Sequence, residues 1–247
     1  MSLSPEAVLE EFAARVRPVA EVVALLVGGS LATGDFQPGV SDFDLVALIE
    51  RPLTKERRRQ VERLHREFIA RRSEAAKLHC VYVPVDDLDD VTVPHVTWAA
   101  RMLFERPLTG IARAELQRFG FSVFGQSPQE ALPPVTAAEL REAVRDDLRR
   151  YWVPALRRPM IWFQDLYVDL SLFTLARAEV TLTNDELITK REALSRLERF
   201  HVPADLIDEI RQRREGQTVP VSPLSRVRRA WTVHRLVSRG LRVLLRP

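Results

Sequence analysis

Two short stretches of the 247-residue sequence decide the fold, VGGSLATG at residues 27–34 and GVSDFDL at residues 39–45. The first stretch ends an apolar run over residues 22–27, which predicts a buried strand closed by a glycine turn. A helix that starts after such a turn presents free backbone N–H groups, and the glycines let a phosphate approach closely. Ser30 adds a hydroxyl donor, so the stretch predicts a phosphate-binding turn.

The second stretch places Asp42 and Asp44 at the start of another apolar run, which predicts a strand over residues 43–49. Side chains two residues apart on a strand point to the same face. Two adjacent carboxylates repel each other unless a cation lies between them, and Mg²⁺ prefers oxygen ligands that it shares with substrate phosphates. The two stretches together predict a nucleotidyl-transfer site with magnesium. The alternative is an ordinary turn followed by a solvated strand edge.

Strands alternate with helices in the first half of the chain and helices stand alone in the second half. The predicted strands are 22–27, 43–49, 78–83 and 121–124, and the first-half helices are 5–17, 54–72 and 95–118, the last broken near 107–110. A linker rich in Gly, Pro, Ser and Gln follows at 125–134, and then come helices at 136–150, 165–180, 190–200, 203–214 and 225–245.

This order predicts two domains. We expect an α/β domain over residues 1–130, with a small mixed sheet and flanking helices. We expect an all-α helical bundle over residues 131–247.

Composition excludes several classes of protein. The chain is 46% hydrophobic and 29% charged, which is typical of a globular protein. No apolar run approaches the ~18 residues that cross a bilayer, and the first residues lack the basic and apolar regions of a signal peptide, so we expect a cytoplasmic protein with no membrane partner. The single cysteine, Cys80, excludes an intramolecular disulfide and a multi-cysteine metal site. The sequence does not indicate an oligomeric state.

The positive charge lies at the C-terminal end. Residues 211–247 hold ten arginines and one glutamate, a net charge of +9, whereas the other 210 residues carry 27 bases and 33 acids, a net charge of −6. Such a segment is either a solvated amphipathic helix or a surface for nucleic acid. We favour the first interpretation and expect no nucleic-acid partner.

The two decisive stretches resemble the signature of a known superfamily. Gly28-Gly29-Ser30, eleven further residues and then Asp42-Phe43-Asp44-Leu45 resemble the DNA-polymerase-β-like nucleotidyltransferases. Segments 78–88, 123–135 and 172–190 extend the resemblance to the aminoglycoside adenylyltransferases, antibiotic-resistance enzymes that modify streptomycin and spectinomycin. The resemblance implies a nucleotidyltransferase domain followed by a helical domain, with the site between them. It also implies transfer of AMP from ATP, with Mg²⁺, onto a hydroxyl of a small-molecule acceptor.

The resemblance also implies roles for individual residues. The turn of Gly28, Gly29 and Ser30 holds the β- and γ-phosphates, and Ser41 lies beside them. Asp42 and Asp44 bind magnesium. Two residues of the helical domain, Arg177 and Lys190, reach the triphosphate.

The third strand departs from the family pattern. Where the family carries a carboxylate that acts as general base, this sequence has His79. Histidine can accept a proton but is a poor magnesium ligand. Three alternatives follow. His79 is the base; or Asp86, Asp87 or Glu105 completes the carboxylate cluster; or turnover is weak or lost, which leaves a nucleotide-binding regulatory or interaction protein.

The acceptor site rests on weaker signals. Aminoglycosides are polycations, so their pocket requires acids and an aromatic wall. The candidates are Trp98, Trp162, Asp165 and Asp169, although Arg213 or Arg214 occupies a position where the family has an aromatic residue. Other acceptors that keep the same chemistry are a metabolite, a protein or an RNA end.

Overall fold

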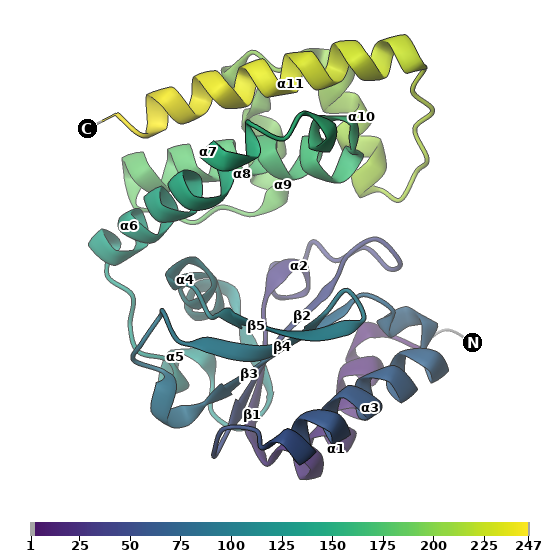
Figure 1. Ribbon diagram of the computed structural model, residues 1–247, viewed down its shortest axis with the longest axis vertical. Helices are drawn as coiled ribbons and strands as arrows, with labels where there is room; N and C mark the ends of the chain where they lie inside the picture. The colour runs from purple at the N-terminus through teal and green to yellow at the C-terminus, as the bar shows by residue number, and fades with distance from the viewer. Residues whose placement is uncertain (1–2, 247) are drawn as a thin grey trace. The chain divides into compact units, whose positions relative to one another are not determined.

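The computed structural model describes residues 3–246 and divides the chain into two units, Met1–Val135 and Thr136–Pro247. The division falls five residues after the predicted one. The first unit holds a mixed sheet with helices, and the second unit is built from helices (Figure 1). The predicted fold class is therefore confirmed.

Six strands form the sheet of the first unit, in the order β5-β4-β3-β2-β1-β6. Only β2 and β3 run parallel, and every other neighbouring pair is antiparallel. The strands are β1 Val22–Val27, β2 Phe43–Ile49, β3 Leu78–Pro84, β4 Pro94–Ala99, β5 Met102–Pro107 and β6 Phe121–Phe124. The central strands β1, β2 and β3 carry near-continuous apolar runs because both faces of the sheet are covered.

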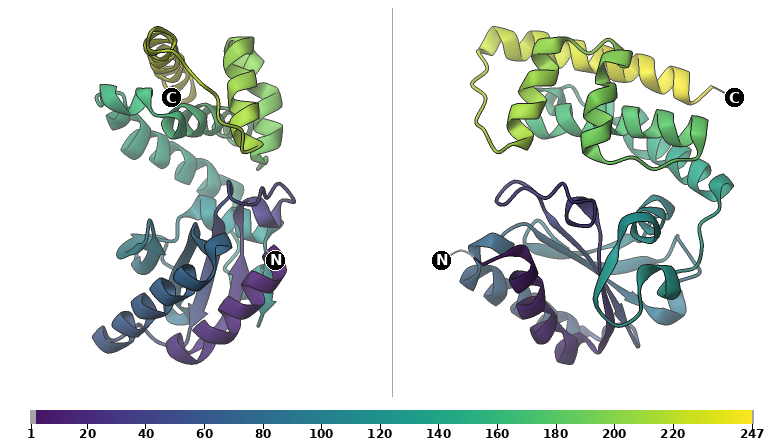
Figure 2. Two further views of the ribbon diagram at one scale, coloured as in Figure 1. Left: turned by 90° about the vertical axis from the view of Figure 1, so that its right-hand side faces the viewer. Right: turned by 180° about the vertical axis from the view of Figure 1, so that it is seen from behind.

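Helices cover the two faces of the sheet separately. One face packs against α1 (Pro5–Ala20) and α3 (Lys55–Arg71), which begin at the capping residues Ser4 and Thr54 (Figures 1 and 2). The other face packs against α4 (Gly110–Phe119) and the short α5 (Pro128–Ala131). The one-turn helix α2 (Gly29–Ala32) follows β1 directly. This arrangement leaves the end of β1 and the starts of β2 and β3 at one edge of the sheet.

The prediction of a helix over residues 95–118 is wrong for its first part. Residues 94–107 form the hairpin of β4 and β5, and only α4 is helical. The hairpin turn uses Ala100 and Arg101, both in the left-handed region with φ of 49° and 65°. The sequence contains no signal for this turn, because two-residue hairpin turns usually carry Asn-Gly or Asp-Gly.

A histidine of α3 is buried in the core. His65 is fully buried, and its Nε2 lies 2.8 Å from the hydroxyl oxygen of Tyr82. Its ring stacks on Trp98 with centroids 4.7 Å apart and planes 8° apart. Burial lowers the pKa of His65 to about 3, so the imidazole is neutral in the folded protein at neutral pH.

The helical unit is organised around α8 (Asp165–Asn184), of whose 20 residues nine are buried. It packs against α6 (Ala137–Asp147), α9 (Lys190–Arg196) and α11 (Pro223–Leu244), and α7 (Val153–Ala155) and α10 (Ala204–Arg214) complete the unit (Figures 1 and 2). A Cβ at Gly240 would lie 2.9 Å from the methyl carbons of Leu175, so glycine lets α11 approach α8 closely. Among the described residues, no helix is long and apolar enough to cross a membrane.

Candidate active site

The glycine turn after β1 lies directly on the Asp44 carboxylate. The backbone N–H of Gly28 donates to the carbonyl oxygen of Asp44 over 2.8 Å, which ties the turn to β2. Gly29 has a φ of +61°, and a Cβ there would lie 2.0 Å from Oδ2 of Asp44. Both the backbone conformation and the lack of space require glycine at position 29. The turn and the aspartate therefore form one rigid unit.

The loop that precedes Asp42 is held by its own hydrogen bonds. The backbone N–H of Gln37 donates to Oγ of Ser41 over 3.0 Å, and Nζ of Lys77 donates to the carbonyl oxygen of Val40 over 2.8 Å. The Ser41 hydroxyl acts as an acceptor in this loop, and its own O–H can still donate to a ligand. Ser30 lies in α2 and is half-buried.

Two aspartates stand at the start of β2 and suit magnesium. Asp42 is the residue immediately before the strand, and Asp44 is its second residue with a side chain 47% exposed. Among residues 3–246, no group of three His, Cys, Asp or Glu side chains is arranged to hold a metal ion alone. Mg²⁺ does not require such a group, because one or two carboxylates, water and substrate phosphates complete its shell. Asp42 and Asp44 therefore fit an ion held jointly with a nucleotide.

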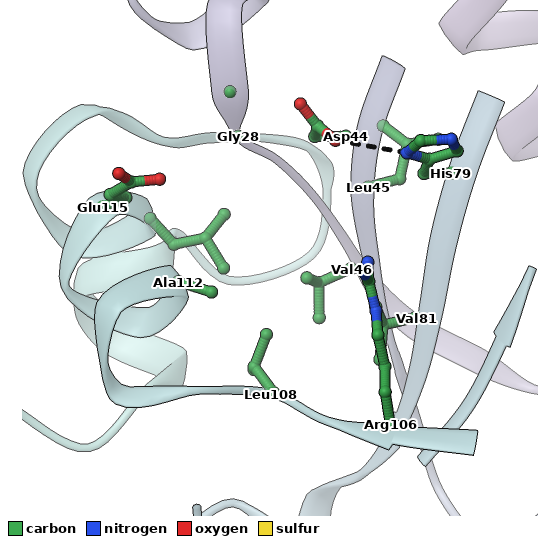
Figure 3. Close-up of a pocket in the computed structure, with 12 residues that line it drawn as sticks. Gly28, Asp44, Leu45, Val46, His79, Val81, Arg106, Leu108, Ala112 and Glu115 are labelled. Carbon is green, nitrogen blue, oxygen red and sulfur yellow. Dashed lines mark ion pairs between the residues drawn. The ribbon is translucent and has the colours of Figure 1, made fainter. Parts of the chain in front are cut away.

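His79 faces Asp44 across the parallel pair of strands. The two residues are register partners, and Nδ1 of His79 lies 3.7 Å from Oδ1 of Asp44 (Figure 3). The imidazole is 28% exposed, so a ligand at Asp44 can reach it. This is the position where the family resemblance implies a general base.

The other predicted carboxylates lie elsewhere. Asp86 and Asp87 belong to the turn Val85–Asp87 after the far end of β3, about 20 Å from His79 at the ~3.3 Å rise of a strand residue. Glu105 pairs with Arg58 of α3 at 2.6 Å, on the opposite sheet face from the pocket residue Arg106. The alternative in which one of these acids completes the cluster is therefore wrong.

A pocket of about 200 Å³ opens beside Asp44 and His79. Val46, Val81 and Leu108 form an apolar floor, and each is at most 5% exposed. Two charged side chains from opposite walls complete the lining: Arg106 at the end of β5 and Glu115 on α4 (Figure 3). Sequence reasoning missed both, because neither belongs to a motif and β5 was expected to be helical.

Comparison with known proteins agrees with this geometry. Residues 6–95 match the family model described as a nucleotidyltransferase domain. The first unit carries a nucleotidyltransferase domain. The predicted enzyme class is thereby confirmed. The match spans α1 to the beginning of β4, and so includes the glycine turn, both aspartates and His79.

The whole chain is similar in fold to a solved enzyme. The crystal structure of spectinomycin adenyltransferase AAD(9) from Enterococcus faecialis with ATP and spectinomycin superposes with a TM-score of 0.73 at 13% sequence identity. The similarity covers 95% of this chain and 100% of that chain. The predicted resemblance to aminoglycoside adenylyltransferases is confirmed as a likeness of fold. A search of curated proteins finds no match.

Trp98, expected at the acceptor site, is a core residue of the nucleotidyltransferase domain. It is 1% exposed, stacks on His65 and faces the layer of α1 and α3. Its side chain is therefore not available to a ligand. Trp162 of the helical unit is likewise buried, at 2% exposure, and packs against His234.

The side chain of Arg177 reaches the segment that precedes Lys190 in the helical unit. Nε of Arg177 donates to the carbonyl oxygen of Ile188 over 2.9 Å, two residues before Lys190. Burial lowers the pKa of Arg177. Lys190 is exposed at the first position of α9, where Thr189 and Glu192 form a capping box. The role of Arg177 and Lys190 in binding a nucleotide stays a prediction.

Asp165 and Asp169 are held by arginines of the same unit. Asp169 accepts two hydrogen bonds from Arg213, at 3.0 Å from Nε and 2.6 Å from Nη2. Asp165 pairs with Arg229, and Glu209 accepts from both arginines. Burial raises the pKa of Asp169, and the hydrogen bonds from Arg213 oppose that rise. The two carboxylates expected to bind a cationic acceptor are therefore already neutralised within the helical unit.

The basic C-terminal segment forms an amphipathic helix. In α11, Val233, Val237 and Leu241 are buried, whereas Arg235, Arg239 and Arg242 are exposed. Helix α11 therefore packs as a solvated amphipathic helix, which is the interpretation that the sequence favoured.

Proposed function

We propose that this chain is an ATP- and magnesium-dependent nucleotidyltransferase that moves AMP onto a hydroxyl of a small-molecule acceptor of the aminoglycoside type. The single observation that carries the proposal is the contact of the Gly29 turn with the Asp44 carboxylate, beside His79. It brings a phosphate-binding turn, a metal-binding carboxylate and a base to one place. Spectinomycin, bound in the related AAD(9) structure, is the first acceptor to test.

Each residue of the site has a part in this reaction. The backbone of Gly28 and Gly29 and the hydroxyls of Ser30 and Ser41 bind the phosphates. Magnesium held by Asp42 and Asp44 would supply positive charge against the phosphate oxygens.

His79 is the proposed general base. Its imidazole takes the proton of the acceptor hydroxyl while that oxygen attacks the α-phosphorus. The new oxygen–phosphorus bond forms as the bond to pyrophosphate breaks, so the products are the AMP ester, pyrophosphate and one proton on His79.

Two cations of the helical unit support nucleotide binding in this proposal. Arg177 and Lys190 contact the triphosphate and offset the charge that builds up on the leaving pyrophosphate. Calorimetry with ATP tests this role, because Lys190→Gln then weakens ATP binding, whereas Arg191→Gln, one position along α9, does not.

Pyrophosphate release tests the reaction itself. Purified protein is given ATP and Mg²⁺ with spectinomycin, streptomycin or neutral polyols, and Asp44→Asn is compared with Asp89→Asn, an exposed aspartate outside the site. We expect acceptor-dependent release that Asp44→Asn abolishes and Asp89→Asn leaves intact. Release that survives in Asp44→Asn would contradict the proposal.

A second candidate function follows from His79. The family carboxylate is replaced by an imidazole 3.7 Å from Asp44, which weakens the site for metal. A nucleotide-binding regulatory protein without turnover would bind ATP in calorimetry and release no pyrophosphate with any acceptor. That pair of results would favour the second candidate over the first.

A further inference from the structure

The solvent side of α11 carries an ordered line of side chains. The helix packs against α8, and its buried residues include Val233, Val237 and Leu241 (Figure 1). On its opposite side, exposed residues follow one another at three- or four-residue spacing: Arg228, Trp231, Arg235, Arg239 and Arg242. At about 100° per residue, these five lie within a sector of about 80°. They form one line along the helix, which we call the α11 stripe.

The stripe holds the exposed tryptophan of the chain. Trp231 is 61% exposed. The other three tryptophans are at most 3% exposed: Trp98, Trp152 and Trp162. The guanidinium carbon of Arg235 lies 4.7 Å from the centroid of the Trp231 ring, and this cation–π contact holds the ring in place. A flat ring that is fixed and exposed in this way offers a surface on which a nucleobase can stack.

The charge of the stripe is positive and little compensated. Residues 223–244, which form α11, include no Asp or Glu. Asp205 of α10 lies 3.8 Å from Arg228, but the side chains are 69% and 76% exposed, so solvent weakens this pair. Nε of Arg242 donates to the carbonyl oxygen of Ser238 over 3.2 Å, which orients the side chain without neutralising it. The stripe therefore attracts an anionic partner.

The order of residues along the stripe favours single-stranded nucleic acid over a membrane. A helix that lies on a bilayer has a continuous apolar side, with its basic residues on the polar side. Here Arg228 and Arg235 stand in line with Trp231, so a surface that receives the ring also receives the guanidinium groups. Single-stranded nucleic acid suits both, because its bases stack on aromatic rings and its phosphates pair with arginine. From Arg228 to Arg242 the stripe spans about 21 Å, room for several nucleotides.

We propose that the α11 stripe binds single-stranded nucleic acid, with a base stacked on Trp231 and phosphates paired with the arginines on either side of it. Composition alone favoured a solvated helix without such a partner. The exposure of Trp231 and its contact with Arg235 change that expectation. This surface is independent of the proposed nucleotidyl transfer, because the whole stripe lies in α11 and none of it lines the pocket at Asp44.

Tryptophan fluorescence tests the proposal directly. The protein is titrated with an oligouridylate and, separately, with an oligothymidylate, so that the two arms distinguish RNA from DNA. We expect quenching of the Trp231 emission as bases stack on the ring. Four arginine–phosphate contacts at about 0.7 each predict a slope of about −2.8 for the logarithm of the association constant against that of the salt concentration. Binding then weakens about 50-fold between roughly 50 mM and 200 mM salt.

Variants separate stacking from charge, and the anisotropy of a labelled oligonucleotide measures their binding. Trp231→Ala weakens binding roughly 5- to 150-fold and leaves the salt slope unchanged. Arg239→Gln weakens binding and reduces the slope by about 0.7. The matched control is Arg59→Gln, an exposed arginine of α3, which changes neither quantity. Urea unfolding of all three should match the parent protein within about 0.5 kcal/mol, because each position is exposed.

Several outcomes would overturn the proposal. One is the absence of quenching by either oligonucleotide at low salt, and another is binding that Trp231→Ala leaves intact. Displacement of the oligonucleotide by ATP would place it at the nucleotidyltransferase site. Equally tight binding of polyglutamate would show that charge alone is recognised. A blue shift of the emission on vesicles of anionic phospholipid, without oligonucleotide binding, would identify a membrane as the partner.

Discussion

Substitution of Gly29 by alanine tests the contact that organises the site. The residue has a φ of +61°, and left-handed backbone costs a residue with a Cβ about 1–2 kcal/mol. The added Cβ would also lie 2.0 Å from Oδ2 of Asp44, whereas ordinary contacts begin at 3.4 Å. The carboxylate or the turn must therefore move by about 1.4 Å. Misplacement of a reacting group by about 1 Å costs roughly 100-fold in rate.

Gly34 provides the matched control. Its φ is +66°, and a Cβ there would meet nothing within 4 Å. Gly34→Ala therefore carries the backbone cost without the clash. Urea unfolding is expected to show a loss of about 1–2 kcal/mol in both variants. Pyrophosphate release is expected to fall about 100-fold in Gly29→Ala and to change little in Gly34→Ala. Equal activities in the two variants would refute the assignment of the Gly29 turn and Asp44 to one catalytic unit.

Three further predictions concern stability, each measured by urea unfolding. The pKa of buried His65 is about 3, whereas an unfolded histidine titrates near 6.5, so the free energy of unfolding falls as the pH drops from 6.5 toward 3. About 2 kcal/mol of that free energy is lost between pH 7 and pH 5. His65→Phe removes this part of the pH dependence. Arg213→Met leaves the carboxylate of Asp169 unpaired and lowers the free energy of unfolding by about 3 kcal/mol. The double variant that also carries Asp169→Leu recovers much of this loss, because no unpaired charge remains. Trp98→Ala lowers the free energy of unfolding by about 3–5 kcal/mol, because this side chain lies in the core. The protein that stays folded keeps an unchanged KM for the acceptor, because Trp98 does not contact it.

The central fold could be predicted because its signals are local. The apolar runs that became β1 and β2 are bounded by glycine and aspartate, and each predicted strand appears within a residue of its expected ends. Helix starts at Ser4 and Thr54 follow from capping chemistry that needs no tertiary contact. Even here a local rule failed, because α1 continues through Pro18 to Ala20 instead of ending at the proline.

The hairpin of β4 and β5 could not be predicted for a physical reason. Its turn places Ala100 and Arg101 at positive φ, a conformation that neither residue favours in isolation. The pairing of the two strands and the burial of Trp98 support that strained turn, and both are tertiary effects. Because the sequence did not predict β5, it also did not place Arg106 in the pocket.

The ion pairs of the helical unit were equally inaccessible to sequence reasoning. Asp169 and Arg213 are 44 residues apart, and Asp165 and Arg229 are 64 residues apart. Spacing along a helix predicts partners three or four positions away, and no such rule covers residues on different helices. The sequence therefore showed the acids and arginines but not that they neutralise each other.

The replacement of a third-strand carboxylate by His79 has a consequence for the charge of the site. A carboxylate at this position would stand beside Asp44, where repulsion between like charges must be offset by a cation. An imidazole places no second carboxylate beside Asp44 and can still accept a proton. Glu115 lies on the opposite wall of the same pocket. His79→Glu should then raise the affinity for Mg²⁺ in calorimetry, because a carboxylate is a better magnesium ligand than an imidazole, and an unchanged affinity would show that position 79 lies outside the metal site.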